Sequence, residues 1–408
     1  MSTVCLSMIV KNETHIIHEC LDSVHKYIDY WVIVDTGSTD GTQELIKKYF
    51  AEKGIPGELI EKPWVSFGHN RSEALALCDG KADYAWMIDA DDKIVGDFKF
   101  PNGKNMTADG YALKCGRDQC IWWRNQIFKT GIGWKYIGVL HEYAHCDKQP
   151  LHQEKIDGNY HLEARTLGHR NVNVTQVEKY SKDAETLIEA LKTEPNNSRY
   201  QFYLAQSYFD SQQWDKATEA YYKRVEMGGW EEECYYSLFR VALIAMAQEK
   251  EWPIIQQKFL DAYDYRPCRA EPLHAIARTL RMMGRPRAAY LFAKEAAQIP
   301  YPQHDILFID TNVYRWMALD ELGATAFYTH DYANGYKSCE ILLKENRLPP
   351  SEVERVRKNY EAYGQKLTEM QRIQPQVVQQ PVTQMTVPSA NKGTYISPRA
   401  NKFKERKK

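Results

Sequence analysis

The chain has 408 residues, which at about 150 residues per domain suggests two or three domains with well-formed cores. Its 53 Lys and Arg residues nearly balance its 54 Asp and Glu residues, so the bulk charge gives no indication of nucleic-acid binding. Nine cysteines without repeated Cys-x-x-Cys pairs are typical of reduced thiols, and no segment has the about 18 apolar residues of a membrane span or the pattern of a secretion signal. We therefore expect a cytoplasmic protein without a transmembrane segment.

The amino-terminal part alternates between two patterns. Short apolar runs predict strands at residues 4–10, 31–35, 57–61 and 84–89, and helical spacing predicts helices at 13–27, 41–50 and 68–78. Strands that alternate with helices at this pitch form βαβ units, so the pattern predicts a mostly parallel sheet. Residues 97–165 are rich in Gly and aromatic residues, and we expect them to supply short strands and functional loops that complete the sheet.

Helical spacing dominates from about residue 174 onward, and the pattern recurs. Residues 199–221 place large, small and aromatic side chains much as a tetratricopeptide helix pair does, with an expected period of about 34 residues. Further copies lie at 234–252, 275–288 and 316–335. The alternative is an ordinary helical domain whose Ala and Tyr residues form its core. We predict an α/β domain over 1–172 and a tetratricopeptide-like helical domain over 173–368.

Residues 369–408 differ in composition from the rest. They are rich in Gln, Pro, Val, Thr and Ser and end in a basic run, Lys402-Phe-Lys-Glu-Arg-Lys-Lys408. Such a segment cannot bury enough apolar surface to become ordered, so we predict a disordered basic tail. Its charge could attract an acidic partner or a phospholipid surface, or serve only for solubility.

An apolar run beginning at Tyr84 ends in three closely spaced carboxylates, Asp89, Asp91 and Asp92. The carboxyl ends of strands are where open α/β sheets bind ligands. Like charges this close favour a cation, and hard carboxylates select Mg²⁺, Mn²⁺ or Ca²⁺. The motif indicates a metal site, with a solvated turn at the strand end as the alternative.

Other predicted strands also end in polar residues. Asp35 ends the second strand and opens a Gly-containing turn before a helix, where it could accept a hydrogen bond from a base or a ribose, or simply belong to a well-capped turn. Lys11 and Glu13 follow the first strand, and Arg71 lies in the third helix. The sequence thus predicts one rim of the sheet lined by polar groups.

Four motifs in this order resemble those of the family 2 glycosyltransferases, which have the GT-A fold. They are Met8-Ile-Val-Lys-Asn-Glu13, Asp35-Thr-Gly-Ser-Thr-Asp40, Asn70-Arg71 and Asp89-Ala-Asp91. Together with Trp230-Glu-Glu-Glu233 and the repeats, the chain resembles the subgroup that fuses this catalytic domain to tetratricopeptide repeats. Lipopolysaccharide-core glucosyltransferases are similar to the first part.

The resemblance implies roles for matching residues. The region of Ile9, Lys11, Glu13 and Asp35 would hold the nucleoside, Arg71 would contact the base or a phosphate, Asp89 the ribose or sugar, and Asp91 a divalent Mn²⁺ or Mg²⁺, with Asp92 as a possible substitute. The chain departs from the family at two places, since Ile9 stands where Pro is common and Thr36 where a second Asp is common. These departures concern the nucleobase contacts more than the metal site.

The segment from Trp134 to Tyr143 resembles an aromatic-rich segment that ends in His-Glu in the same subgroup. This similarity implies that Glu142 is the general base and that His141 contacts metal or phosphate, although a hydrogen-bonded histidine near the core is an equal alternative for His141. A second polar cluster, which could contact the diphosphate or form a solvated linker, consists of His161, Arg165, His169 and Arg170. Three tryptophans could stack on a sugar or pack in the core, namely Trp122, Trp123 and Trp134.

These observations predict a metal-dependent, inverting glycosyltransferase that moves a hexose from a UDP-sugar or another nucleotide-diphosphate sugar to a hydroxyl of a glycan or protein acceptor. The helical repeats would bind the acceptor, recruit a protein partner or form a homodimer. Two alternatives remain open. One is an interaction scaffold with a vestigial transferase domain, and the other is a sugar nucleotidyltransferase, although residues 8–13 lack the Gly-rich phosphate loop of that class.

Overall fold

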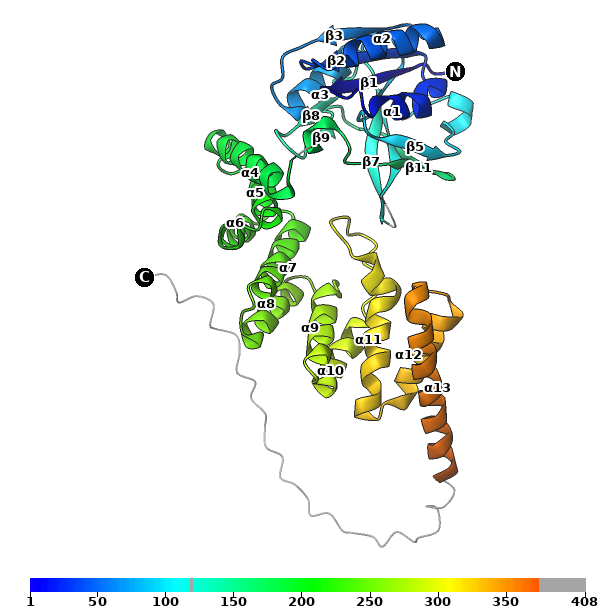
Figure 1. Ribbon diagram of the computed structural model, residues 1–408, viewed down its shortest axis with the longest axis vertical. Coiled ribbons are helices and arrows are strands. Elements are labelled where there is room, and N and C mark those ends of the chain that lie inside the picture. Colours follow the sequence, from blue (N-terminus) through cyan, green and yellow to red (C-terminus); the bar gives the residue numbers. More distant parts are fainter. Residues whose placement is uncertain (118–119, 173, 374–408) are drawn as a thin grey trace.

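The computed structural model describes residues 1–117, 120–172 and 174–373, which form an α/β unit followed by a helical region (Figure 1). Most of the predicted tail lies outside the described residues. The final helix, α13 (Pro350–Ile373), includes residues 369–373, so helical structure extends beyond the predicted start of the tail.

A nine-stranded sheet forms the centre of the α/β unit, in the order β3-β2-β1-β4-β7-β6-β11-β5, with β10 paired to β6. Its strands are β1 (Val4–Val10), β2 (Tyr30–Asp35), β3 (Gly57–Glu61), β4 (Tyr84–Met87), β5 (Lys93–Gly96), β6 (Gly110–Arg117), β7 (Cys120–Lys129), β10 (Gln153–Ile156) and β11 (Tyr160–Glu163). The first four strands are parallel, whereas β7 runs antiparallel between β4 and β6. The predicted, mostly parallel sheet is confirmed, but long antiparallel β6 and β7 stand where short strands were expected.

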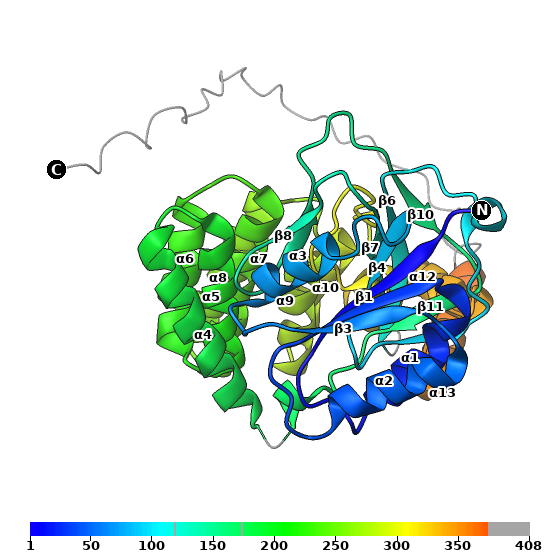
Figure 2. The same ribbon diagram turned by 90° about the horizontal axis from the view of Figure 1, so that it is seen from above.

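Helices cover both faces of the sheet. Helices α1 (Ile17–Val24) and α2 (Thr42–Lys53) pack on one face, and α3 (Phe67–Ala76) packs on the other with a small sheet of β8 (Lys135–Ile137) and β9 (Tyr143–His145) (Figure 2). Along β1, Leu6 and Met8 face the first pair of helices while Cys5 faces α3. Burial on both faces explains why the strand is apolar except for Ser7.

The chain between β1 and α1 forms a turn rather than the predicted start of a helix. Asn12 has a φ of 57°, outside the right-handed helical region, and α1 begins at Ile17. The Glu13 N–H donates to Thr42 Oγ1 at 2.8 Å, which joins this turn to the start of α2. Glu13 therefore lies on the rim at the carboxyl end of β1 rather than inside a helix.

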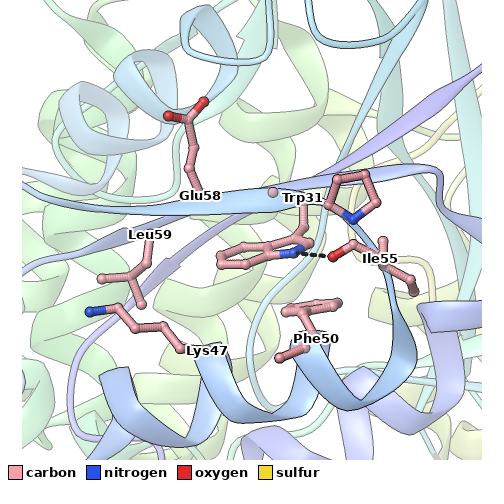
Figure 3. A pocket seen from close by; sticks show the side chains of 9 residues that line it. Trp31, Lys47, Phe50, Ile55, Glu58 and Leu59 are labelled. Carbon is pink, nitrogen blue, oxygen red and sulfur yellow. Dashed lines mark hydrogen bonds between the residues drawn. The ribbon is translucent and has the colours of Figure 1, made fainter.

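At the β3 edge, Trp31 stacks on Phe50, with ring centroids 4.6 Å apart, and its Nε1 donates to the Ile55 carbonyl at 3.1 Å (Figure 3). A cavity of about 390 Å³ opens beside these rings, between α2 and β3. The predicted site residues are absent from its described lining. This cavity belongs to the packing of the sheet edge rather than to the rim with the carboxylates.

Replacing Gly57 with Ala is expected to destabilise this edge. A Cβ at Gly57 would lie 2.3 Å from atoms of the Trp31 ring, so the stacked ring or β3 must shift. Overpacking of this kind costs about 1–3 kcal/mol of unfolding free energy, measurable from the urea midpoint. Gly364→Ala is the matched control, because its Cβ would make an ordinary 3.7 Å contact with Tyr336. Equal midpoints for the two variants would contradict the packing of Trp31 against Gly57.

The described helical region runs from α4 to α13, and each helix packs mainly against its neighbours in the chain (Figure 1). The helices before α13 are α4 (Gln176–Thr193), α5 (Ser198–Asp210), α6 (Trp214–Glu226), α7 (Glu231–Ala247), α8 (Trp252–Tyr265), α9 (Glu271–Met282), α10 (Pro286–Ala296), α11 (Ala318–Thr325) and α12 (Tyr332–Lys344). The four predicted repeat segments fall on successive helix pairs from α5 to α12, which confirms the predicted pairing. Across the described ranges, no helix is both long and apolar enough to span a bilayer.

The acidic run after Trp230 has a structural role at the start of α7. Glu233 is buried and lies 2.8 Å from the buried guanidinium of Arg224. Glu232 accepts hydrogen bonds at 2.7 Å from the backbone N–H groups of Ile306 and Leu307. These contacts fix neighbouring parts of the helical region to one another.

Candidate active site

Arg71 lies at the centre of the polar rim. This α3 residue donates through one terminal nitrogen to Asp89, just after β4, and its Nε is 2.7 Å from Oε1 of Glu142, in the turn between β8 and β9. The side chains of Arg71 and Glu142 are each only 13% exposed. The fold therefore brings together three predicted site residues that are distant in the sequence.

A second guanidinium completes this cluster. Arg124 of β7 pairs with Asp92, and its other terminal nitrogen is 3.6 Å from Asp89 Oδ2. Arg124 was not among the predicted site residues. Its one local signal is a cation that directly follows two tryptophans, and its proximity to Asp89 depends on the long-range pairing of β7 with β4. Asp92, predicted as a substitute metal ligand, is instead buried against this arginine.

The two aspartates of the cluster differ electrostatically. Burial works to raise the pKa of Asp89, but the charges of Arg71 and Arg124, with the hydrogen bond from Arg71, hold that pKa below its ordinary value. For Asp92, burial raises the pKa by more than Arg124 lowers it. Asp89 is therefore an ionised hydrogen-bond acceptor at neutral pH.

A cavity of about 330 Å³ opens onto this cluster. Its lining residues are Arg71, Met87, Arg124, Asn125, Gln126, Tyr136, Glu142, Tyr143 and Ala144. The guanidinium of Arg71 also lies over the Tyr136 ring, 5.7 Å from its centroid. Two cations beside a carboxylate and two phenols suit a ligand that carries both negative charge and hydroxyl groups.

Asp91 and Glu13 meet at a turn that follows β11. Asp91 Oδ2 accepts from the backbone N–H groups of Leu167 and Gly168, at 2.8 and 2.9 Å. Both Glu13 carboxylate oxygens are 3.2 Å from the backbone nitrogen of His169. A Cβ at Gly168 would lie 3.3 Å from Glu13 Oε1 and 3.5 Å from Asp91 Oδ2. Two carboxylates thus converge on the glycine of this turn.

The Glu13 carboxyl group has a raised pKa. Burial raises its pKa to about 7, and the charge of Asp91 adds to the shift although the His169 N–H opposes it. Paired hard carboxylates fit Mg²⁺ or Mn²⁺, which commonly take one or two protein carboxylates together with substrate phosphates. Within the described residues, no group of three or more His, Cys, Asp or Glu side chains is arranged to hold a metal on its own. Substrate oxygens would have to complete such a site.

Glu13→Gln is expected to flatten the pH dependence of stability. Since the folded-state pKa of about 7 exceeds the ordinary 4.5, the folded state binds this proton more tightly. The contribution is therefore fully present below pH 4.5 and is lost as the pH rises through about 7. Glutamine cannot ionise, so the variant lacks this loss. Urea unfolding across that window measures both slopes, and identical slopes would contradict the burial of Glu13 beside Asp91.

Asp35 offers an unpaired acceptor on the same rim. Its Oδ1 accepts from the backbone N–H groups of Gly37 and Ser38, each at 2.8 Å. Its Oδ2 is buried and meets no donor among the described residues, and the same holds for the Ser7 hydroxyl in β1. A buried acceptor without a partner costs free energy, so Asp35 Oδ2 fits a ligand that donates a hydrogen bond.

The His141 ring contacts the helical region. It stacks on Tyr203 of α5, with centroids 3.9 Å apart, and the His141 carbonyl accepts from Arg199. Although the residue is exposed, desolvation of the stacked ring and the nearby arginine charge lower its pKa to about 4. This geometry gives no support to His141 as a metal ligand. Of the other predicted contacts, Ile9 packs beneath α3 and Lys11 is exposed beyond β1.

Three of the four residues of the second polar cluster, Arg165, His169 and Arg170, follow β11 in the chain. Arg165 donates from Nε to the Asp91 carbonyl at 2.6 Å and from a terminal nitrogen to Glu19 at 2.7 Å. His169 approaches Asn12, whereas His161 belongs to β11. Trp134 is a core residue whose Nε1 donates to the Asp109 carbonyl, while Trp122 is exposed and Trp123 lies beside Lys114 and Lys155.

Parts of the chain are similar to known proteins. Residues 5–136 match the family model of glycosyl transferase family 2. Over 87 residues the chain is 32% identical to the lipopolysaccharide core biosynthesis glycosyltransferase LpsC of Rhizobium meliloti, which covers 21% of this chain and 31% of LpsC. Over 96 residues it is 31% identical to a TPR repeat-containing protein of Synechococcus elongatus, covering 23% of this chain and 22% of the relative.

This chain thus spans less than a third of the length of these two relatives. Among solved structures, the crystal structure of MamA aligns with 46% of this chain and 92% of its own, at 14% identity and a TM-score of 0.31. The family match therefore concerns the amino-terminal unit, of which residues 5–136 match glycosyl transferase family 2.

Proposed function

We propose that the protein is a metal-dependent, inverting glycosyltransferase that moves a hexose from a nucleotide-diphosphate sugar, with a UDP-sugar as the leading donor, to a hydroxyl of a glycan or protein acceptor. The observation that carries this proposal is the bridge made by Arg71 between Asp89 and Glu142 at the mouth of the 330 Å³ cavity. The family 2 match supports transfer chemistry, and the name of LpsC supports a saccharide product.

The rim offers complementary groups for each part of such a donor. The unpaired Asp35 Oδ2 suits a base N–H or a ribose hydroxyl, and the ionised Asp89 suits a ribose or sugar hydroxyl. Arg71 and Arg124 provide positive charge for a diphosphate, to which guanidinium groups form strong, charge-assisted hydrogen bonds.

Asp91 and Glu13 are the residues that would hold a divalent cation. Their carboxylates converge at Gly168, each within 3.5 Å of the position that a Cβ on that glycine would take. When bound, Mn²⁺ or Mg²⁺ would offset the charge that develops on the departing diphosphate. We leave His141 out of this assignment because its ring lies against Tyr203.

Glu142 is the proposed general base. Its carboxylate takes the proton of the acceptor hydroxyl while the acceptor oxygen bonds to the anomeric carbon. The bond from that carbon to the diphosphate oxygen breaks, and the electron pair leaves with the nucleoside diphosphate. Attack from the face opposite the leaving group inverts the anomeric configuration, as in inverting glycosidases. Arg71 holds Glu142 in place through its Nε contact.

Calorimetric titration tests the proposal. The full chain is titrated with UDP, UDP-glucose, UDP-galactose, UDP-N-acetylglucosamine and GDP-mannose, with and without Mn²⁺. Metal-dependent binding of a donor is expected, and NMR of the released or transferred sugar then reports the anomeric configuration. A folded protein that binds none of these nucleotides would reject the transferase and favour the interaction scaffold.

A further inference from the structure

The segment that carries Glu142 is held in place from outside the α/β unit. The His141 carbonyl accepts hydrogen bonds from Arg199 of α5, at 2.8 Å from one terminal nitrogen and 3.3 Å from Nε. The His141 ring stacks on Tyr203 one turn further along the same helix, with an interplanar angle of 9°. The Arg199 guanidinium also lies 5.0 Å from the ring centroids of Tyr143 and Tyr203. Both neighbours of Glu142 in the chain thus contact one helix.

The backbone at this point needs such support. His141 has a φ of 52°, a left-handed conformation that is unfavourable for residues other than Gly. This conformation directs adjacent side chains to different partners, since His141 meets Tyr203 while Glu142 meets Arg71. The preceding residue, Leu140, is buried in an apolar cluster with Ala184 and Leu187 of α4 and Tyr200 and Leu204 of α5.

Helix α4 also contacts the chain next to the proposed metal site. Arg170, just after the turn that caps Asp91, pairs with Asp183 of α4 and lies over the Phe67 ring of α3. Helices α4 and α5 of the helical region therefore contact the segment that carries Glu142 and the chain beside the proposed metal site.

From these contacts we propose that helix α5 is a positioning element of the active site, in which Arg199 and Tyr203 fix the backbone of His141 and thereby the place of Glu142 beside Arg71. The proposal rests on the proposed function, because it takes Glu142 as the base. Neither Arg199 nor Tyr203 contacts the reacting atoms, and both act through the backbone and ring of His141. The helical region then contributes to the geometry of the active site through α5.

Two measurements on the full chain test this inference. Amide hydrogen exchange of residues 138–143 reports how firmly the segment is held, whether or not the protein turns over a donor. Release of UDP from the UDP-sugar selected by the titration, with water as acceptor, reports kcat and the donor KM. The variants are Arg199→Ala, Arg199→Lys, Tyr203→Leu and Tyr203→Phe. Arg287→Ala is the matched control, because Arg287 Nε likewise donates to a backbone carbonyl, that of Tyr328, near α10.

Arg199→Ala and Tyr203→Leu are expected to speed exchange in residues 138–143 and to lower kcat roughly 10- to 100-fold, as a small misplacement of a catalytic group does. The donor KM stays unchanged, because Asp35, Asp89 and Arg124 remain in place. Tyr203→Phe keeps the stacked ring and should match the wild type. Arg199→Lys, which retains one donor nitrogen, should give intermediate exchange and kcat.

Faster exchange with an unchanged kcat would overturn the positioning role, as would an equal loss of kcat in Arg287→Ala. A wild-type protein that binds none of the nucleotides and releases no UDP would reject the proposed function, and the exchange data would then stand alone. In that case unchanged exchange in Arg199→Ala would overturn the inference, and faster exchange would support the contact with α5.

Discussion

Asp91→Asn is expected to lower turnover by roughly 10³-fold, equivalent to the several kcal/mol that a Lewis-acidic cation contributes. The asparagine oxygen can still accept from the Leu167 and Gly168 N–H groups, so the turn after β11 keeps its anchor. The variant loses only the charge that, beside Glu13, attracts the cation. UDP release at saturating donor and Mn²⁺ measures the effect, and circular dichroism checks the fold.

Asp97→Asn is the matched control for this substitution. Asp97 is an exposed aspartate that pairs with Lys99 away from the carboxylate rim, so the same chemical change there should leave turnover at the wild-type level. Mn²⁺ titration adds a second criterion, because the Asp91 variant should bind the ion more weakly than the control does. Wild-type turnover and Mn²⁺ affinity in Asp91→Asn would remove Asp91 from the metal site.

The first half of the sheet could be predicted from sequence because its strands are buried on both faces. Such strands are near-continuous apolar runs, and the run of β1 corresponds to residues 4–10 as predicted. The pairing of β6 with β7 was not predicted, although the two strands are consecutive in the chain, because their register shifts between Tyr111 and Ala112 and interrupts a regular strand alternation. The start of α1 was misplaced because the helical spacing over residues 13–27 does not reveal the turn that precedes Ile17.

The site was predictable to a similar extent. Asp35, Arg71 and Asp89 lie where the alternation of strands and helices places them, at one end of a parallel sheet. Arg124 could not be assigned, since its role follows from the position of β7 beside β4. His141 and Glu142 are adjacent in sequence, yet the left-handed backbone sends their side chains to different domains, which residue type alone does not reveal.

Glu142→Gln is expected to lower turnover about 10²- to 10⁴-fold, the range by which a positioned general base accelerates a reaction. Glutamine cannot take the acceptor proton, but its amide oxygen can remain beside Arg71 Nε, so the cluster keeps its shape. The affinity for UDP measured by calorimetry should therefore stay at the wild-type value while kcat falls. Glu154→Gln is the control, because Glu154 is an exposed residue of β10 paired with His152.

The double variant Arg199→Ala/Glu142→Gln separates positioning from chemistry. If Arg199 acts only by placing the Glu142 carboxylate, its removal has little left to disturb once that carboxylate is an amide, and the double variant should be about as slow as Glu142→Gln alone. If the two losses multiply, Arg199 contributes to turnover by another route, such as the stability of the segment as a whole. Wild-type turnover in Glu142→Gln would instead remove the base from this segment, and α5 would then have a structural contact with it but no catalytic residue to position.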